Sequence, residues 1–102
     1  MSGAGDAAGL PGGVSLRVVI RGRVQGVGFR YAFADEAISH QLRGWVRNRR
    51  DGSVEAIVAG PAADVDAIIT WSRRGPPAAQ VTAVETSATD GDFARFEVAP
   101  TV

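Results

Sequence analysis

The sequence lacks cysteine, lysine and any long apolar run, and each absence excludes a class of protein. Without cysteine, the 102-residue chain forms no disulfide, no thiolate nucleophile and no cysteine-ligated metal site. All eleven basic residues are arginine and balance eleven carboxylates, so no net charge attracts nucleic acid or an anionic membrane. No apolar stretch approaches the about 20 residues that cross a bilayer. We therefore expect one small cytoplasmic domain, with no nucleic-acid or membrane partner.

The first thirteen residues, MSGAGDAAGLPGG, are mostly glycine and other small residues without an apolar period. Such a segment has little surface to bury and much conformational entropy to lose on ordering. It also lacks the basic flank and the continuous apolar segment of a signal peptide. We predict a disordered tail over residues 1–13 and a folded domain over residues 14–102.

Beyond the tail, the apolar period changes repeatedly, which predicts alternating strands and helices. VSLRVVIRG alternates as a strand does, FRYAFADEAISHQL repeats apolar residues at helical spacing, and PAADVDAIITWSRRG begins and ends like a helix. RGWVRN and SVEAIVAG flank a tight turn at Asp51-Gly52, and AQVTAVETSA and FARFEV predict the last strands. The order βαββαβ predicts an α+β fold, a ferredoxin-like split βαβ sandwich with two helices on one face of an antiparallel sheet.

Two adjacent rows of the first helix are apolar. One row runs through Phe29, Phe33 and Ala37, and the other through Ala34, Ile38 and Leu42.

The stretch GRVQGVGFR joins the first strand to the first helix. A glycine loop exposes successive backbone N–H groups, and the first turn of a helix leaves its amides unpaired with a partial positive charge. Gly26 and Gly28 allow a tight turn and let a tetrahedral oxyanion approach the backbone. The guanidinium of Arg30 suits bidentate binding of two phosphate oxygens. The stretch predicts an anion site, although a short glycine loop alone is as readily a plain strand-to-helix turn.

A second candidate is Asn48, at the end of the second strand. Its side-chain carbonyl can accept a hydrogen bond from water while its NH₂ donates elsewhere. In a split βαβ sheet this strand end lies beside the glycine loop, so Asn48 can position an attacking water. The alternative is that Asn48 only starts the hairpin turn.

Together the two stretches resemble the acylphosphatase family. The downstream stretches AGP, RRGPP and FEV also recur where the family has them, and the resemblance runs from about Val14 to Val98. The matching residues are Gly22, Val24-Gln25-Gly26-Val27, Phe29-Arg30, Gly44-Trp45-Val46-Arg47-Asn48 and Asp51-Gly52-Ser53-Val54-Glu55.

The resemblance implies a hydrolase that splits small acyl phosphates into a carboxylate and inorganic phosphate, with no metal and no cofactor. It implies that Arg30 and Asn48 are catalytic, with the Arg30 guanidinium on the phosphoryl group and the Asn48 amide orienting the water. The backbone amides implied to hold the phosphoryl oxygens are those of Gln25, Gly26, Val27, Gly28, Phe29 and Arg30. Because a carboxylate is already a good leaving group, positioning and charge stabilisation can carry this reaction. We expect a monomer.

The chain departs from the family where the first helix ends. His40-Gln41 stands where the family usually has leucine and glycine, so Gln41 is expected in a left-handed conformation that favours glycine. His40, the only histidine, lies at the far end of the helix from the glycine loop and is expected to be structural.

Two alternatives from other classes stay open. One is an acylphosphatase-like domain that binds anions or regulates without turnover, or one whose natural substrate is a carbamoyl-type phosphate. The other is an RNA-binding module of the same element order, which is disfavoured because VEAIVAG has no aromatic residue for base stacking.

Overall fold

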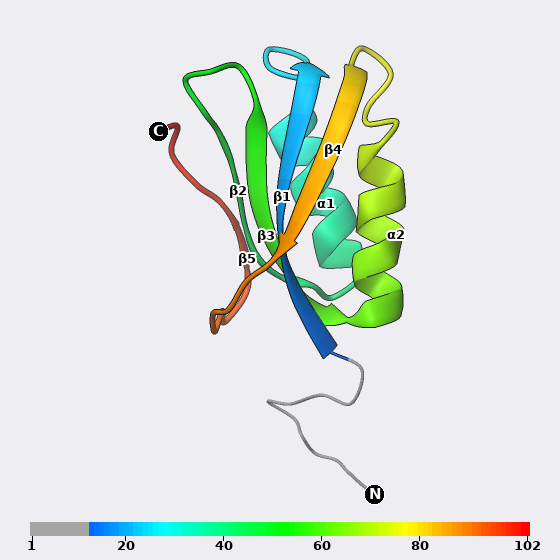
Figure 1. Cartoon of the computed structure of the whole chain (residues 1–102), viewed down its shortest axis with the longest axis vertical. Coiled ribbons are helices and arrows are strands. Elements are labelled where there is room, and N and C mark those ends of the chain that lie inside the picture. The colour runs from blue at the N-terminus through cyan, green and yellow to red at the C-terminus, as the bar shows by residue number, and fades with distance from the viewer. Residues whose placement is uncertain (1–12) are drawn as a thin grey trace, which may run out of the picture.

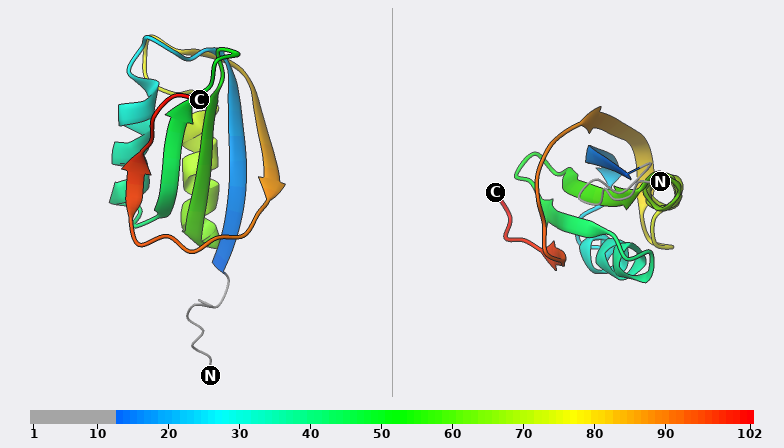
Figure 2. Two further views of the ribbon diagram at one scale, coloured as in Figure 1. Left: turned by 90° about the vertical axis from the view of Figure 1, so that its left-hand side faces the viewer. Right: turned by 90° about the horizontal axis from the view of Figure 1, so that it is seen from below.

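The computed structural model describes residues 13–102. Its elements are β1 (Gly13–Arg23), α1 (Phe29–Ser39), β2 (Arg43–Asn48), β3 (Val54–Pro61), α2 (Ala62–Ser72), β4 (Gln80–Ala88) and β5 (Phe96–Val98). The strands form one five-stranded sheet, and both helices lie on one of its faces (Figures 1 and 2). The predicted α+β fold and order of elements are therefore confirmed.

The predicted tail lies outside the described residues except at its last position. Gly13 pairs with Pro61 and is the first residue of β1, so at this position the expected disorder is wrong.

The strand order is β4-β1-β3-β2-β5, which places β3 at the centre between β1 and β2. β1 pairs antiparallel with both β3 and β4, and β2 pairs antiparallel with β3. β5 instead pairs parallel with β2, from Gly44↔Phe96 to Val46↔Val98. The connection after β4 crosses the lower end of the sheet, so β5 enters the edge in the direction of β2 (Figure 2). The sheet is thus mixed, not antiparallel throughout as expected.

The core lies between the sheet and the two helices. Aromatic rings join the layers, since Phe33 of α1 lies 6.0 Å from Trp71 of α2 and 5.8 Å from Phe96 of β5, measured between ring centroids. Fully buried aliphatic side chains from the strands and α2 complete the core, namely Val18, Ile20, Val46, Val54, Val58, Val65 and Ile68.

The second apolar row of α1 faces the core only in part. Ala34 is buried, but Ile38 is 57% exposed, so the apolar row does not face the core along its whole length. Four helical residues turn through about 400°, so each i,i+4 step rotates the row by about 40° and carries Ile38 away from the sheet. Leu42 is buried because it follows the end of the helix, where the chain turns back toward β2.

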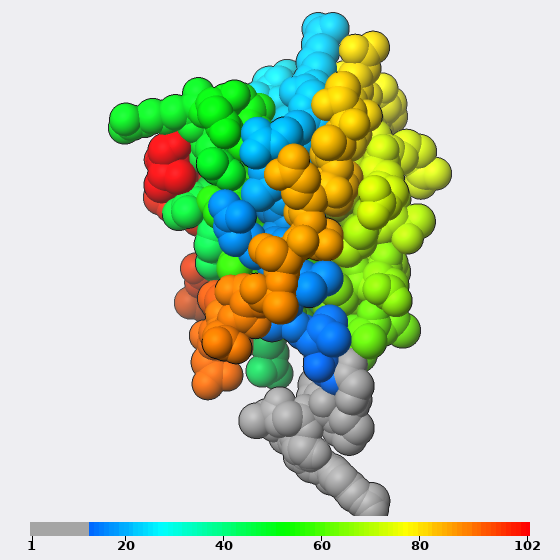
Figure 3. Space-filling view, viewed as in Figure 1, coloured from blue at the N-terminus to red at the C-terminus, as the bar shows by residue number. Residues whose placement is uncertain are grey.

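The two loops that carry the sequence motifs lie at the same end of the sheet (Figure 1). β1 and β2 both run antiparallel to β3, so their carboxyl ends point the same way. In the space-filling view, the β2–β3 turn projects at this end, beside the surface formed by β1 and β4 (Figure 3). Within residues 13–102, no helix is long and apolar enough to cross a membrane.

Candidate active site

The loop between β1 and α1 has its glycines where the backbone turns left-handed. Gly26 has φ 73° and Gly28, the N-cap of α1, has φ 78°. A Cβ at either position would meet nothing within 4 Å, so these glycines are required for conformation and not for space. The loop therefore curls into the first turn of the helix without crowding its own concave side.

The backbone N–H groups of this loop have no hydrogen-bond acceptor among the described residues. Ala32 donates its N–H to the Gly28 carbonyl at 3.1 Å, but within residues 13–102 no amide from Gln25 to Arg30 donates to a backbone carbonyl. No side chain caps the helix either. These N–H groups therefore form a cradle with partial positive charge, suited to an anion.

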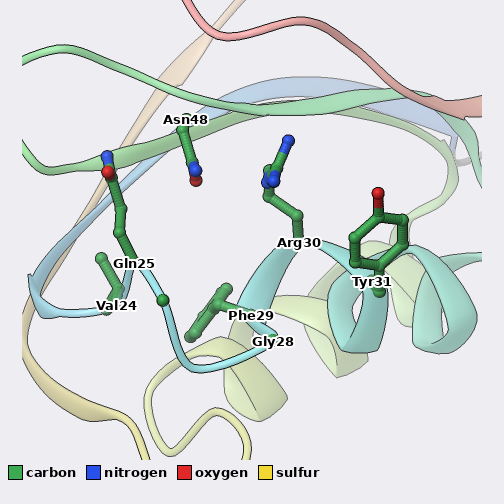
Figure 4. A pocket seen from close by; sticks show the side chains of 8 residues that line it. Val24, Gln25, Gly28, Phe29, Arg30, Tyr31 and Asn48 are labelled. Atoms are coloured by element: carbon green, nitrogen blue, oxygen red, sulfur yellow. The ribbon is translucent and has the colours of Figure 1, made fainter.

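A pocket of about 130 Å³ opens over the cradle. The Asn48 amide and the Arg30 guanidinium enter the same space, above the loop (Figure 4). The lining residues are Val24, Gln25, Gly26, Gly28, Phe29, Arg30, Tyr31 and Asn48. The structure thus brings together all of the predicted site residues except Val27, which packs partly buried against the core.

Arg30 carries a charge that its own surroundings do not neutralise. No carboxylate lines the pocket, and among the described residues Arg30 forms no ion pair. Its guanidinium carbon lies 5.5 Å from the ring centroid of Tyr31, a cation–π contact that leaves the N–H groups available. Tyr31 was not predicted as a site residue, because nothing in the sequence distinguishes it from an ordinary surface position of a helix, and its ring is exposed.

Asn48 is held by its backbone and presents its side chain to the pocket. Its carbonyl accepts a hydrogen bond from the Val102 N–H at 3.2 Å. Val102 lies on the same edge of β2 as β5, in the chain that follows β5. No residue of the described chain hydrogen-bonds to the side-chain amide of Asn48. That amide is therefore available to water or a ligand.

The side chain of Gln25 leaves the cradle and reaches the β2–β3 turn. Its Nε2 donates to the carbonyl oxygens of Arg49 at 2.7 Å and Ser53 at 2.9 Å. The sequence assigned Gln25 only a backbone role, because a glutamine gives no local sign of the segment that its side chain will reach.

The β2–β3 turn is itself fixed by Asp51. One carboxylate oxygen, Oδ1, accepts the Ser53 hydroxyl at 2.6 Å and the Ser53 N–H at 2.9 Å. These two hydrogen bonds lower the pKa of Asp51 below its usual value, and the bond from the Ser53 hydroxyl has the larger effect. Gly52 has φ 93°, as the predicted tight turn requires.

The far end of α1 takes no part in this site. His40 Nδ1 lies 2.9 Å from Asp64 Oδ1, which joins the end of α1 to the start of α2, and Gln41 has φ 57° as predicted. In the described part of the chain, no three metal-ligating side chains cluster closely enough to hold a metal ion.

Comparison with known proteins connects this geometry to a family. The acylphosphatase family model matches residues 16–98. An acylphosphatase from Cupriavidus necator is 52% identical over 86 residues, which cover 84% of this chain and 94% of that protein.

Two solved structures share the fold. An acylphosphatase from Coxiella burnetii has a TM-score of 0.83 at 32% identity, over 86% of this chain and 94% of its own. Acylphosphatase from Bacillus subtilis has a TM-score of 0.81 at 35% identity, over 84% of this chain and 98% of its own. With the cradle, the arginine and the asparagine converging on one pocket, these matches show that the chain belongs to the acylphosphatase family.

Proposed function

We propose that the pocket over the cradle hydrolyses small acyl phosphates, with the phosphoryl group on the amides from Gln25 to Arg30 and the acyl group toward solvent. One observation carries this proposal. Unpartnered backbone amides, an arginine without an ion pair and a free side-chain amide converge on a pocket that no carboxylate lines, within the described residues. Such a site suits a phosphoryl dianion and a neutral nucleophile.

The phosphoryl oxygens accept hydrogen bonds from the cradle and from Arg30, which stabilise the charge that spreads over them during transfer. The side-chain oxygen of Asn48 accepts a hydrogen bond from the attacking water and so orients a lone pair of the water toward phosphorus. The water oxygen bonds to phosphorus as the bond to the acyl oxygen breaks, and the carboxylate leaves with that electron pair. Both protons of the water stay on the released inorganic phosphate, so the products balance without a covalent enzyme intermediate.

The proposal also holds that no metal takes part. The test is a continuous assay with a small aromatic acyl phosphate, run with and without excess chelator. We expect full turnover in both, because amides and a guanidinium bind the phosphoryl group. Turnover that is lost with chelator and restored by a divalent ion would contradict this part of the proposal.

A non-catalytic anion-binding or regulatory domain is not favoured, because both Arg30 and Asn48 are present in the pocket. If the protein bound phosphate but did not turn over acyl phosphates, the non-catalytic alternative would be favoured instead. The monomeric state and the cytoplasmic location stay predictions, which gel filtration and cell fractionation would test.

A further inference from the structure

The two halves of the site belong to strands that do not touch. The cradle follows β1, and Asn48 ends β2, but β3 lies between these strands in the sheet. No ladder hydrogen bond therefore sets the distance from the cradle to Asn48 directly. A direct contact between the loop and the β2–β3 turn holds that distance more tightly than the two ladders through β3 alone, and a misplacement near 1 Å is costly for catalysis.

The Gln25 side chain supplies such a contact. It crosses the start of β3 and hydrogen-bonds to Arg49, the residue after Asn48, and to Ser53, the residue before β3. The Ser53 carbonyl also accepts the Arg49 N–H at 2.9 Å, so both acceptors belong to the closed base of one turn. Gln25 therefore contacts the turn at the point where Asn48 leaves it.

The chemistry of the amide fixes the orientation of this side chain. A carboxamide nitrogen has two N–H donors, and here each has a carbonyl acceptor. Rotating the amide by half a turn would place its oxygen against two carbonyl oxygens and lose both bonds. Among carboxamide and carboxylate side chains, only glutamine satisfies both acceptors, since a glutamate donates nothing when ionised and an asparagine is one methylene shorter.

We infer that Gln25 is a positioning residue, whose side chain sets the distance between the anion cradle and Asn48. This inference rests on the proposed function, in which Asn48 orients the attacking water. It assigns the loop a second task beyond presenting its amides, and it assigns the β2–β3 turn a part in aligning the nucleophile.

The test is a double-mutant cycle of Gln25→Met and Asn48→Ala, read by steady-state kinetics and by calorimetry of inorganic phosphate binding. Methionine keeps the length and neutrality of the side chain and removes both donors. We expect Gln25→Met to lower kcat by about 10–10²-fold, the scale of a misplacement near 1 Å, with phosphate affinity within a few-fold of the parent. In the Asn48→Ala background we expect the same change to cost less than about threefold in kcat, because the group that it positions is gone.

Gln80→Met is the matched control, because Gln80 is exposed at the start of β4 and makes no side-chain hydrogen bond within residues 13–102. We expect it to leave kcat unchanged. If Gln25→Met fails to fold, as judged by circular dichroism, Gln25→Leu replaces it in the cycle. The inference would be overturned if Gln25→Met lowered kcat by the same factor in the parent and in the Asn48→Ala background. It would also be overturned if Gln25→Met left kcat unchanged, or if it weakened phosphate binding as much as Arg30→Ala does.

A second readout separates this inference from the proposed function. Asn48 is the only asparagine of the sequence, so its side-chain NH₂ gives a single pair of asparagine signals in an NMR spectrum. Phosphate should shift these signals in the parent and shift them less in Gln25→Met. If the parent binds phosphate but does not turn over, the proposed function fails while this comparison still tests the positioning role of Gln25. Equal shifts in the two proteins would show that Gln25 does not position Asn48.

Discussion

Asn48 lies directly opposite Val54 in the ladder between β2 and β3, and Val54 is completely buried. Opposed residues of an antiparallel pair place their side chains on the same face of the sheet. Since Val54 points into the core beneath the helices, Asn48 points to that face too, at the end of the sheet where α1 begins. The register of one hairpin thus aims Asn48 at the cradle and not at the open face.

Replacing each of the two predicted catalytic side chains should separate their roles. We expect Asn48→Ala to lower kcat by about 10²–10³-fold, with phosphate affinity within a few-fold of the parent, because Asn48 contacts mainly the water. Arg30→Ala should lower kcat and also raise KM, because Arg30 binds the phosphoryl group before and during transfer. Steady-state kinetics and calorimetry with phosphate measure both effects.

Arg43→Ala is the control for Arg30→Ala, because Arg43 is an exposed arginine at the opposite end of β2. It should change neither constant. An Asn48→Ala enzyme that kept most of its kcat, or that lost phosphate binding as severely as Arg30→Ala, would return Asn48 to the role of a turn residue.

Inorganic phosphate and sulfate should inhibit competitively, since either tetrahedral anion fits the amides that hold the phosphoryl group. The same inhibition should weaken in Arg30→Ala, which lacks one of the ligands of the anion. Initial rates over a grid of substrate and anion concentrations measure this. A noncompetitive pattern would place the anion outside the cradle.

Acid should destabilise the fold through Glu55. Burial alone would raise the pKa of Glu55, but hydrogen bonds from Arg47 at 2.9 Å and Arg17 at 2.7 Å outweigh it and hold the pKa below the ordinary 4.5. A lowered folded-state pKa contributes stability above the unfolded-state pKa, and this contribution is lost as pH falls through the folded value. We therefore expect the free energy of unfolding to fall on acidification below about pH 4.5, and Glu55→Gln to lack that part of the fall.

At neutral pH, Glu55→Gln should itself cost roughly 1–3 kcal/mol, because it weakens charge-assisted hydrogen bonds to two arginines. Urea denaturation across a pH series measures both effects. Glu97→Gln is the control. The side chains of Glu97 and Arg95 are 59% and 78% exposed, so their ion pair should contribute little to stability. Equal pH profiles for the parent and Glu55→Gln would contradict the assignment.

Gln41→Gly should stabilise the fold by up to about 1 kcal/mol, because Gln41 has φ 57° and glycine adopts this conformation without steric cost. Gln80→Gly makes the same chemical change in an exposed strand and should destabilise by roughly 0.5–1 kcal/mol. Thermal and urea unfolding of both variants measure the difference. Two variants that shift stability in the same direction would show that conformation at residue 41 is not the cause.

The sequence was informative where a property depends on a few neighbouring residues. The glycine loop and the tight turn at Asp51-Gly52 follow from local conformational preferences. The left-handed Gln41 was expected instead from the glycine that the family usually has at this position, and the structure confirms both the turn and this conformation. The parallel pairing of β5 and the exposure of Ile38 depend on how the chain crosses the sheet and on how far α1 rotates. The two hydrogen bonds of Gln25 join residues 24 and 28 positions apart, and no local pattern encodes such a contact.

The position of β1 between β3 and β4 has a consequence for how fast the native state is reached. Both neighbours of β1 come from distant parts of the chain, as the contact between Arg21 and Glu85, 64 residues apart, illustrates. Closing these long loops costs conformational entropy before the strand contacts form, so this topology slows folding. Because the cradle continues from β1, enzymatic activity should return during refolding together with the burial of Trp71 against Phe29 and Phe33, and not before it.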